Sequence, residues 1–249
     1  MSKNSISKTF EIIRAFTDEK PQWGVNELAR FLDVPPSTLH RILKTLREEN
    51  ILTVDEDTKR YQIGEEMIRL SSIVSSRIGI TNIASRPLKE LAEEIGETIY
   101  LGIYQPKDLK LSFVDCFRSS VNSVQYVLDI GILQTLTLGA SGKVILAHLP
   151  KETVEHIFLT EDVSFEQRDL ISKQINFLKS KGYLYTENER NVSAFGISAP
   201  ILSGKNGIVG SVSCVIPSKV FNMNSLEEKA EKIKQTAKEI STLLGYSGL

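Results

Sequence analysis

Residues 25–46 read VNELARFLDVPPSTLHRILKTL, and this stretch predicts two short helices joined by a tight turn. Apolar residues recur at helical spacing on both sides of the turn. Pro35 or Pro36 can open the second helix, because the first N–H of a helix needs no partner. Asp33 stands where a left-handed residue is wanted, and Asp tolerates that region better than most residues. The positions expected to face inward are Leu28, Ala29 and Leu32 before the turn and Leu39, Ile42, Leu43 and Leu46 after it.

The opposite face of the second helix carries side chains of the kind that contact DNA. Helix, turn and helix have the spacing of a helix-turn-helix unit, whose second helix enters the major groove. Hydroxyl groups and an imidazole can contact phosphates or base edges, and Arg41 can bond guanine through two hydrogen bonds. The alternative is a surface helix with ordinary solvated charges. The candidate DNA-contacting residues of this helix are Pro36, Ser37, Thr38, His40, Arg41 and Lys44.

The segments around this unit complete a small domain. Residues 51–54 and 60–63 are strand-like and flank a polar turn. At the tip of this hairpin, Lys59 and Arg60 are further candidates for DNA contact, as a wing that touches phosphate or the minor groove. Residues 1–64 therefore predict a winged helix-turn-helix domain. Its first helix is expected to bury one apolar face, formed by Ile6, Phe10, Ile13 and Phe16.

From residue 65 the pattern changes. Residues 65–80 are expected to form a linker helix with Met67, Leu70, Val74 and Ile78 on one face. Residues 81–249 mix helices and strands, which indicates an α+β domain with a largely antiparallel sheet. The expected strands are 98–104, 109–117, 121–130, 195–202 and 208–216. The expected helices are 82–95, 140–149, 152–159, 166–181 and 225–244.

The composition narrows the class of protein. Of the 249 residues 41% are hydrophobic and 24% are charged, as in a folded globular chain. Basic and acidic residues number 30 and 31, so the overall charge marks neither a nucleic-acid nor a membrane binder. Two cysteines and three separated histidines exclude a structural zinc site of the usual spacing. Because no signal peptide and no membrane-spanning run is seen, we expect a soluble, cytoplasmic protein without metal or cofactor.

The segment from Gly139 to Lys143, GASGK, invites two catalytic interpretations, and both fail on spacing. A phosphate-binding loop needs Gly at position 137 and Ser or Thr at position 144, which hold Thr137 and Val144. A nucleophile elbow around Ser141 needs Gly in place of Lys143. The glycines are expected instead to open a helix. Exposed N–H groups at the start of that helix would suit a small anion such as a carboxylate.

The other chemically active side chains favour structural roles. His148 and His156 have no paired nucleophile nearby in the sequence. Cys116 and Cys214 alternate with apolar neighbours and are expected inside strands. Glu187 and Glu189 could act as an acid/base pair if the segment is extended, but a solvated edge is the favoured interpretation. No catalytic site is therefore expected.

Taken in order along the chain, these segments resemble the IclR family of bacterial transcriptional regulators. The resemblance covers nearly the whole chain. It implies a GAF-like C-terminal domain that senses a small metabolite, and a homodimer or dimer of dimers on a palindromic operator of double-stranded DNA. The segments that carry it are Val25–Ala29, Pro36–Leu46, Tyr61–Gly64, Gly139–Ala147, Gly182–Tyr183, Ile197–Ile201 and Ala237–Gly245.

The resemblance also implies where the metabolite, the effector, would bind. Several positions there depart from the family pattern: Gly196 stands where Cys is common, Thr186 where an acidic residue is frequent, and Val215 where a small polar residue occurs. Leu138 likewise breaks a small-residue pattern before the glycine. With fewer polar groups, the ligand is not expected to be a simple keto acid of two or three carbons. The effector-binding residues implied are Ala140, Ser141, Thr186, Gly196, Ser198 and Ser213.

The leading hypothesis is a DNA-binding transcriptional regulator, a repressor, whose operator affinity changes when a small organic effector, a carboxylate, binds the C-terminal domain. One alternative is an enzyme built on the C-terminal α+β domain with a DNA-tethering module. Another is a partner-binding module whose winged helix contacts protein. The failed motifs weigh against the enzyme.

Overall fold

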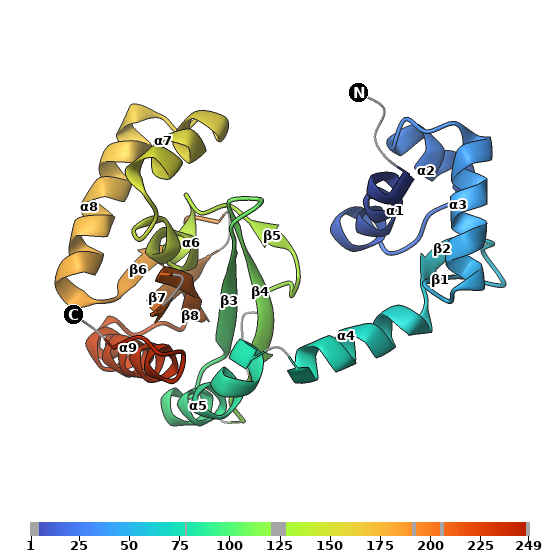
Figure 1. The fold of residues 1–249 in the computed structure, drawn as a ribbon. Coiled ribbons are helices and arrows are strands. Elements are labelled where there is room, and N and C mark those ends of the chain that lie inside the picture. The colour runs from blue at the N-terminus through green and yellow to red at the C-terminus, as the bar shows by residue number, and fades with distance from the viewer. Residues whose placement is uncertain (1–4, 78, 121–127, 191–192, 205–206, 248–249) are drawn as a thin grey trace. The chain divides into compact units, whose positions relative to one another are not determined.

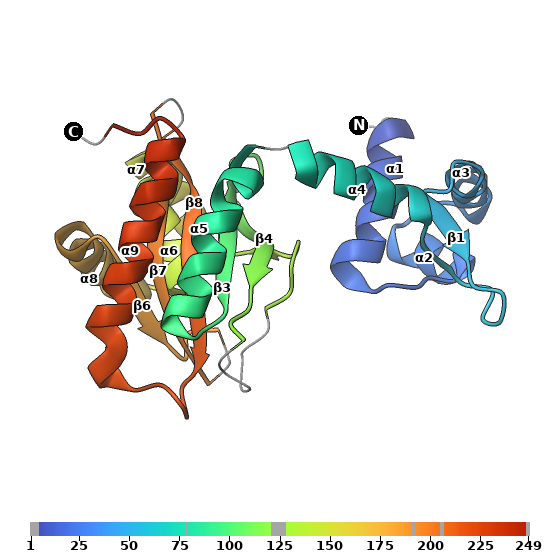
Figure 2. The same cartoon turned by 90° about the horizontal axis from the view of Figure 1, so that it is seen from below.

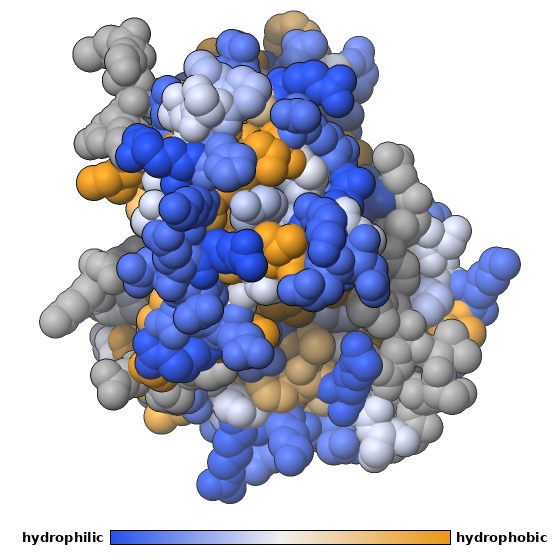
Figure 3. Space-filling model, turned by 90° about the vertical axis from the view of Figure 1, so that its right-hand side faces the viewer, coloured by the Kyte–Doolittle hydropathy of each residue, from blue (hydrophilic) through white to orange (hydrophobic). Residues whose placement is uncertain are grey.

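The computed structural model describes residues 5–77, 79–120, 128–190, 193–204 and 207–247. The chain divides into two compact units, Met1–Ile78 and Gly79–Leu249 (Figure 1). Within the described residues no helix is both long enough and apolar enough to cross a membrane. On the face drawn in Figure 3, hydrophilic residues predominate and apolar ones form separate small patches.

The N-terminal unit has the helix and hairpin order expected of a winged helix-turn-helix. Three helices precede a two-stranded antiparallel sheet in which Leu52 pairs with Ile63, and a fourth helix follows it. Trp23 ties the first helical segment to the sheet, because its indole N–H donates to the Ala15 carbonyl and its backbone pairs with Tyr61. The elements are α1 (Ser5–Arg14), the π-helical turn η1 (Ala15–Glu19), α2 (Val25–Phe31), α3 (Pro36–Glu48), β1 (Leu52–Val54), β2 (Tyr61–Ile63) and α4 (Glu65–Arg77).

The turn between α2 and α3 has the predicted geometry. Asp33 adopts φ 50°, the left-handed conformation expected from its position. The next residue, Val34, is buried and donates its N–H to the Ala29 carbonyl. All four predicted core positions of α3 are buried, as are Leu28 and Ala29 of α2. The two helices therefore pack through the expected apolar faces.

The face predicted for the first helix is wrong in part. Phe16 is buried, but Ile6 and Phe10 are 64% and 56% exposed. Ile12, at 0% exposure, takes the central position instead. Ile12 and Phe16, four positions apart, form the buried face, and Ile6 and Phe10 lie on another face of α1.

Among the described residues, the C-terminal unit is built on one six-stranded sheet in the order β5-β4-β3-β8-β7-β6. Every neighbouring pair is antiparallel. The long hairpin of β7 and β8 forms the centre together with β3. The strands are β3 (Ile99–Gln105), β4 (Lys110–Phe117), β5 (Leu133–Gln134), β6 (Leu184–Glu187), β7 (Ala194–Ser203) and β8 (Gly207–Pro217).

Helices cover both faces of this sheet (Figures 1 and 2). α5 and α9 lie side by side on one face, where Leu88 and Ile233 are buried. α6 lies on the other face with α8 outside it, and Val144 and Ile145 are buried there. The sheet is therefore apolar on both sides. The helices are α5 (Gly79–Ile95), α6 (Gly139–Leu146), α7 (Lys151–Thr160), α8 (Phe165–Lys181), the 3-10 turn η2 (Met223–Ser225) and α9 (Leu226–Leu243).

The predicted strands of this unit are confirmed with one exception. Most of the strand expected at 121–130 falls on residues 121–127, which lie outside the described residues, and residues 128–130 are not in a strand. The sequence patterns missed β5 and β6, which have two and four residues, too few to show an alternation.

Candidate functional site

The exposed face of α3 presents the side chains that the sequence placed there. Ser37, His40 and Arg41 are exposed, and Thr38 is half-buried at the first turn. Pro36 occupies the start of the helix, as its missing N–H allows. Lys44 is exposed, with its Nζ 3.8 Å from the Glu48 carboxylate. Because such exposed pairs contribute little, that lysine is available to an outside anion.

The two basic residues of the hairpin differ in their surroundings. Lys59 is exposed at the tip in a left-handed conformation, φ 54°, and its Nζ lies 3.9 Å from Glu56. The tip is shaped by Asp55, whose carboxylate accepts the N–H of Thr58 at 2.7 Å. Arg60 instead forms an ion pair with Glu27 of α2.

Glu27 joins the hairpin to the start of α2. Its carboxylate pairs with Lys20 and Arg60 and accepts the Gly24 N–H at 3.4 Å. The hydrogen bond from Lys20 lowers the pKa of Glu27, so the carboxyl group stays ionised. Arg60 therefore has a structural partner within the unit, which the sequence did not indicate.

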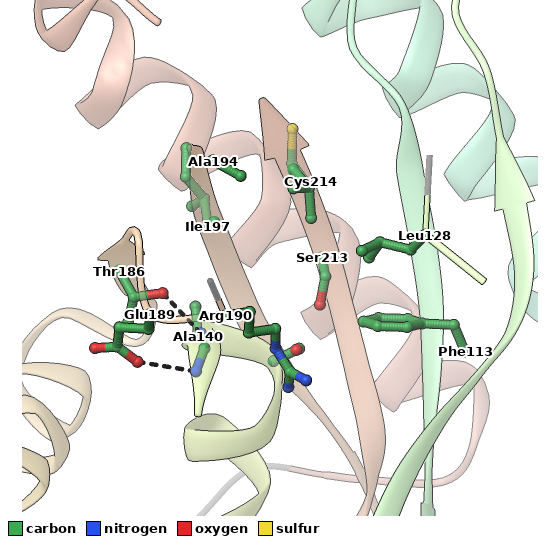
Figure 4. Close-up of a pocket in the computed structure, with 14 residues that line it drawn as sticks. Phe113, Leu128, Ala140, Thr186, Glu189, Arg190, Ala194, Ile197, Ser213 and Cys214 are labelled. Atoms are coloured by element: carbon green, nitrogen blue, oxygen red, sulfur yellow. Dashed lines mark hydrogen bonds between the residues drawn. The ribbon is translucent and has the colours of Figure 1, made fainter. Parts of the chain in front are cut away.

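The C-terminal unit contains a cavity of about 50 Å³ on the α6 face of the sheet (Figure 4). It lies between the N-terminus of α6, the residues after β6, and strands β4, β7 and β8. Its walls are mostly apolar, and its polar groups come from Ser141, Thr186, Ser213, Glu189 and Arg190. The remaining lining residues are Phe113, Leu128, Gly139, Ala140, Ala194, Gly196, Ile197, Cys214 and Val215.

Five of the six residues implied as effector contacts line this cavity: Ala140, Ser141, Thr186, Gly196 and Ser213. The sixth, Ser198, does not. It is 0% exposed and its hydroxyl donates to the Val212 carbonyl at 3.0 Å and bonds the Ser213 hydroxyl. Ser198 therefore supports Ser213 from below the cavity wall.

The expectation of free N–H groups at the N-terminus of α6 is wrong for the first two residues. The Gly139 N–H donates to Glu189 at 2.9 Å, and the Ala140 N–H donates to the Thr186 hydroxyl at 3.0 Å (Figure 4). The chain's own carboxylate occupies the position that suits an anion at a helix start. An outside carboxylate would have to displace it or bind elsewhere in the cavity.

Glu189 was expected at a solvated edge, and that interpretation is also wrong. Its side chain is 16% exposed and pairs with Lys143, which is 2% exposed, at 2.5 Å. Gln174 of α8 bonds both groups. Burial lowers the pKa of Lys143, while the hydrogen bond from its nitrogen to Glu189 raises it. Lys143 and Glu189 thus form an ion pair in which Glu189 lines the cavity and Lys143 lies buried behind it.

Arg190, Phe113 and Leu128 are cavity residues that the sequence did not indicate. The Arg190 guanidinium donates to Gln134 Oε1 at 2.6 Å and to the Leu138 carbonyl at 2.7 Å. Position 139 favours glycine because its φ is +73°, and a Cβ there would lie 2.6 Å from Arg190 Nε, so the arginine side chain would have to shift. The glycine that opens α6 was visible in the sequence, but the arginine that packs on it was not.

In the part of the chain that the structure describes, no three or more His, Cys, Asp or Glu side chains gather so that they could hold a metal ion. Cys214 is fully buried, and burial raises the pKa of its thiol well above the usual range. Cys116 is half-buried. His148 and His156 are exposed on the surface, in agreement with the structural interpretation.

Comparison with known proteins identifies both units. A family model of the IclR helix-turn-helix domain matches residues 5–56, and a model described as the bacterial transcriptional regulator IclR C-terminal matches residues 73–242. The chain belongs to the IclR family. It is a DNA-binding transcriptional regulator, and its C-terminal domain is the ligand-binding domain.

Curated relatives and solved structures agree with this assignment. The HTH-type transcriptional regulator KipR of Bacillus subtilis is 24% identical, over 98% of this chain and 98% of its own. The glycerol operon regulatory protein of Streptomyces coelicolor is 26% identical over 85% of each chain. An IclR regulator from Alicyclobacillus acidocaldarius superposes with a TM-score of 0.87 at 18% identity, covering 97% and 99% of the two chains.

A further solved structure contains a ligand. An IclR homologue from Microbacterium hydrocarbonoxydans, complexed with 4-hydroxybenzoate, superposes with a TM-score of 0.81 at 16% identity and covers 97% of this chain and 99% of its own. At 16% sequence identity, this similarity shows a shared fold.

Proposed function

We propose that this IclR-family regulator is a cytoplasmic repressor whose affinity for a palindromic operator changes when a small organic acid occupies the cavity beside α6. The observation that carries the proposal is the pairing of two features in one chain. One is an α3 face with exposed Ser37, His40 and Arg41, and the other is a largely apolar cavity with a few converging polar groups.

The DNA-reading part rests on exposure and charge. Arg41 is exposed on α3 and suited to guanine, while Lys44 and Lys59 suit phosphates. Pro36, Ser37, Thr38 and His40 complete the proposed surface. Arg60 is the weakest member, since its ion pair with Glu27 would have to open or be shared.

The dimeric part rests on apolar exposure within the N-terminal unit. Ile68 and Leu70 on α4 are 63% and 39% exposed, and α1 exposes Ile6 and Phe10. Burial of such side chains between two copies is favourable. A two-fold dimer then matches the two half-sites of a palindromic operator, and pairs of dimers remain compatible with this arrangement.

The effector part rests on the lining of the cavity and on the relative that binds 4-hydroxybenzoate. A tenfold change in operator affinity requires about 1.4 kcal/mol of differential binding between two states, which one small ligand can supply. Ala140, Ser141, Thr186, Gly196 and Ser213 are the proposed contacts.

The test of the proposal is footprinting on the DNA that flanks the chain's own gene. Protection of a two-fold site, with affinity that falls as salt rises, is expected. Ser141→Tyr, which fills the cavity, should leave that footprint intact and abolish its response to a metabolite extract. Failure of the wild-type chain to protect any flanking sequence would contradict the regulator proposed here, and an unchanged response in Ser141→Tyr would place the effector elsewhere.

A further inference from the structure

The charges around the effector cavity do not balance. Lys143, Glu189 and Arg190 form one cluster at the start of α6, with two cations and one carboxylate. Both oxygens of Glu189 are already bonded: one accepts from Lys143 and from the Gly139 N–H, and the other accepts from Gln174. One half-buried positive charge is therefore left over at the cavity.

That surplus charge lies on Arg190. Its hydrogen bonds go to neutral oxygens: the Gln134 amide, the Thr135 carbonyl at 3.4 Å and the Leu138 carbonyl. A guanidinium has five N–H donors, so three bonds leave two of them, including Nε–H, with no acceptor among the described residues. Figure 4 shows the guanidinium bordering the same space as Ser213 and Phe113.

The arginine is also fixed in position. Its side chain packs on Gly139, where no Cβ intervenes, and its two terminal nitrogens are held by the segment 134–138. Burial lowers the pKa of Arg190 although the nearby Glu189 raises it, which is the direction expected of a cation short of compensating charge. A desolvated cation is stabilised by an anion that brings further hydrogen bonds.

Beyond the two charged residues Glu189 and Arg190, the cavity lining is apolar except for three hydroxyl groups. Phe113, Leu128 and Val215 are apolar lining residues on the α6 side of the sheet, and Ser141, Thr186 and Ser213 supply hydroxyl groups. A polyhydroxylated acid has more hydroxyl groups than these three side chains can pair, and each unpaired one would lie against apolar side chains at a cost.

We propose that the effector is a small monocarboxylic acid with an apolar or aromatic body, and that Arg190 binds its carboxylate while Glu189 keeps the α6 N-terminus closed to it. This inference rests on the proposed effector function and defines its ligand class and its anchor. It differs from the sequence-based expectation, in which the helix N–H groups themselves would bind the acid.

The first experiment needs no variant. Calorimetric titration of the wild-type chain compares each acid with its neutral amide: benzoate with benzamide, and 4-hydroxybenzoate with 4-hydroxybenzamide. Isovalerate and gluconate, which both carry one carboxylate, compare an apolar chain with a polyhydroxylated one. The acids with apolar bodies should bind roughly tenfold to a hundredfold more tightly than the amides, the range of a charge-assisted hydrogen bond. Gluconate should bind at least tenfold more weakly than isovalerate.

The second experiment assigns the anchor. Arg190→Gln should lose the preference for acid over amide, and Arg190→Lys, which keeps the charge but not the fork of donors, should retain part of it. Arg168→Gln on α8 is the matched control, because that arginine does not line the cavity. Circular dichroism confirms that each variant is folded. If Arg190→Gln does not fold, the acid and amide comparison on the wild-type chain still decides the ligand class.

The outcomes separate this inference from the proposed function. Equal binding of acids and amides, no binding of any acid, or an unchanged acid preference in a folded Arg190→Gln variant would each overturn it. A footprint that persists and responds to the neutral amides would retain the effector-controlled regulator and reject the carboxylate anchor. Loss of the footprint itself would reject the regulator instead.

Discussion

The Glu189 carboxylate accepts the main-chain N–H of Gly139 over 2.9 Å, across 50 positions of sequence. This bond closes the N-terminus of α6 from inside the protein. The same oxygen pairs with Lys143, so one carboxylate satisfies both a helix end and a buried ammonium group. The wall of the cavity therefore depends on an ion pair that lies almost entirely out of solvent.

Breaking this pair from one side should destabilise the C-terminal unit. Lys143→Met or Glu189→Gln is expected to lower the free energy of unfolding by about 3 kcal/mol, because each leaves a buried charge without its partner. The double variant should recover part of the loss. Scanning calorimetry measures all three. Lys173→Met is the control: its pair with Asp169 is 2.6 Å long but lies 72% and 66% exposed, and should contribute below about 1 kcal/mol. Additive losses in the double variant would show that the two groups act independently.

The sequence predicted the features that nearby residues determine, namely turn conformation and the buried faces of helices. It missed the contacts between segments that are far apart in the chain. Asp33 had to adopt a left-handed conformation because the helices on both sides fix the turn, and it does so. Leu39 and Leu43 had to be buried because the helical period places them on one face. The bond from Gly139 to Glu189 has no such local signal, and neither does the packing of Arg190 on that glycine, since the segments meet only when the sheet has formed.

Gly64 is expected to be indispensable to the N-terminal unit. A Cβ at this position would lie 2.2 Å from the Asn50 carbonyl oxygen, a contact that the backbone cannot relieve without moving. Gly64→Ala should lower the free energy of unfolding of this unit by about 1–3 kcal/mol. Fluorescence of Trp23, the one tryptophan of the chain, follows that unit selectively in urea. Gly79→Ala, where no atom lies within 4 Å of the added methyl group, should leave the transition in place.

Glu161 is expected to make stability depend on pH. Burial by itself raises the pKa of this carboxyl group. The hydrogen bonds from Lys110, Thr135 and Thr137 together lower it by more, so its pKa lies below the ordinary value for a glutamate. The folded chain then holds a proton less tightly than the unfolded chain. The stabilisation is present above the unfolded pKa, about 4.3, and is lost as the pH falls through the folded pKa.

Glu161→Gln should accordingly cost about 1–3 kcal/mol at pH 7. The difference from the wild-type chain should shrink steadily between about pH 5 and pH 3, where the wild-type carboxyl group also becomes neutral. Calorimetric unfolding across this range measures it. Glu152→Gln, at an exposed position of α7, serves as the control and should show no such convergence. If the loss of unfolding free energy in Glu161→Gln does not change with pH, side-chain packing and not the carboxylate charge stabilises this site.

The proposed dimer predicts that a charge on α4 separates the subunits. Leu70→Glu places a carboxylate on a side chain that is 39% exposed in the single chain. Light scattering at micromolar concentration should show the mass of one chain for this variant and at least twice that mass for the wild type. Leu159→Glu on α7, where the leucine is 71% exposed, should leave the mass unchanged. A wild-type chain that is itself monomeric and binds DNA one to one would reject the dimer.

The two basic residues of α3 should contribute to DNA binding in different ways. Arg41→Ala is expected to cost roughly 1–3 kcal/mol and to relax specificity at one position of each half-site, because a bidentate contact to guanine is lost. Lys44→Ala should weaken binding to all sequences alike and lower the slope of log affinity against log salt by about one, as one phosphate contact disappears. Gel-shift titrations on operator and scrambled DNA at several salt concentrations separate the two effects. Lys151→Ala, in the C-terminal unit, is the control for loss of a surface charge. Wild-type affinity in both α3 variants would remove this helix from the DNA interface.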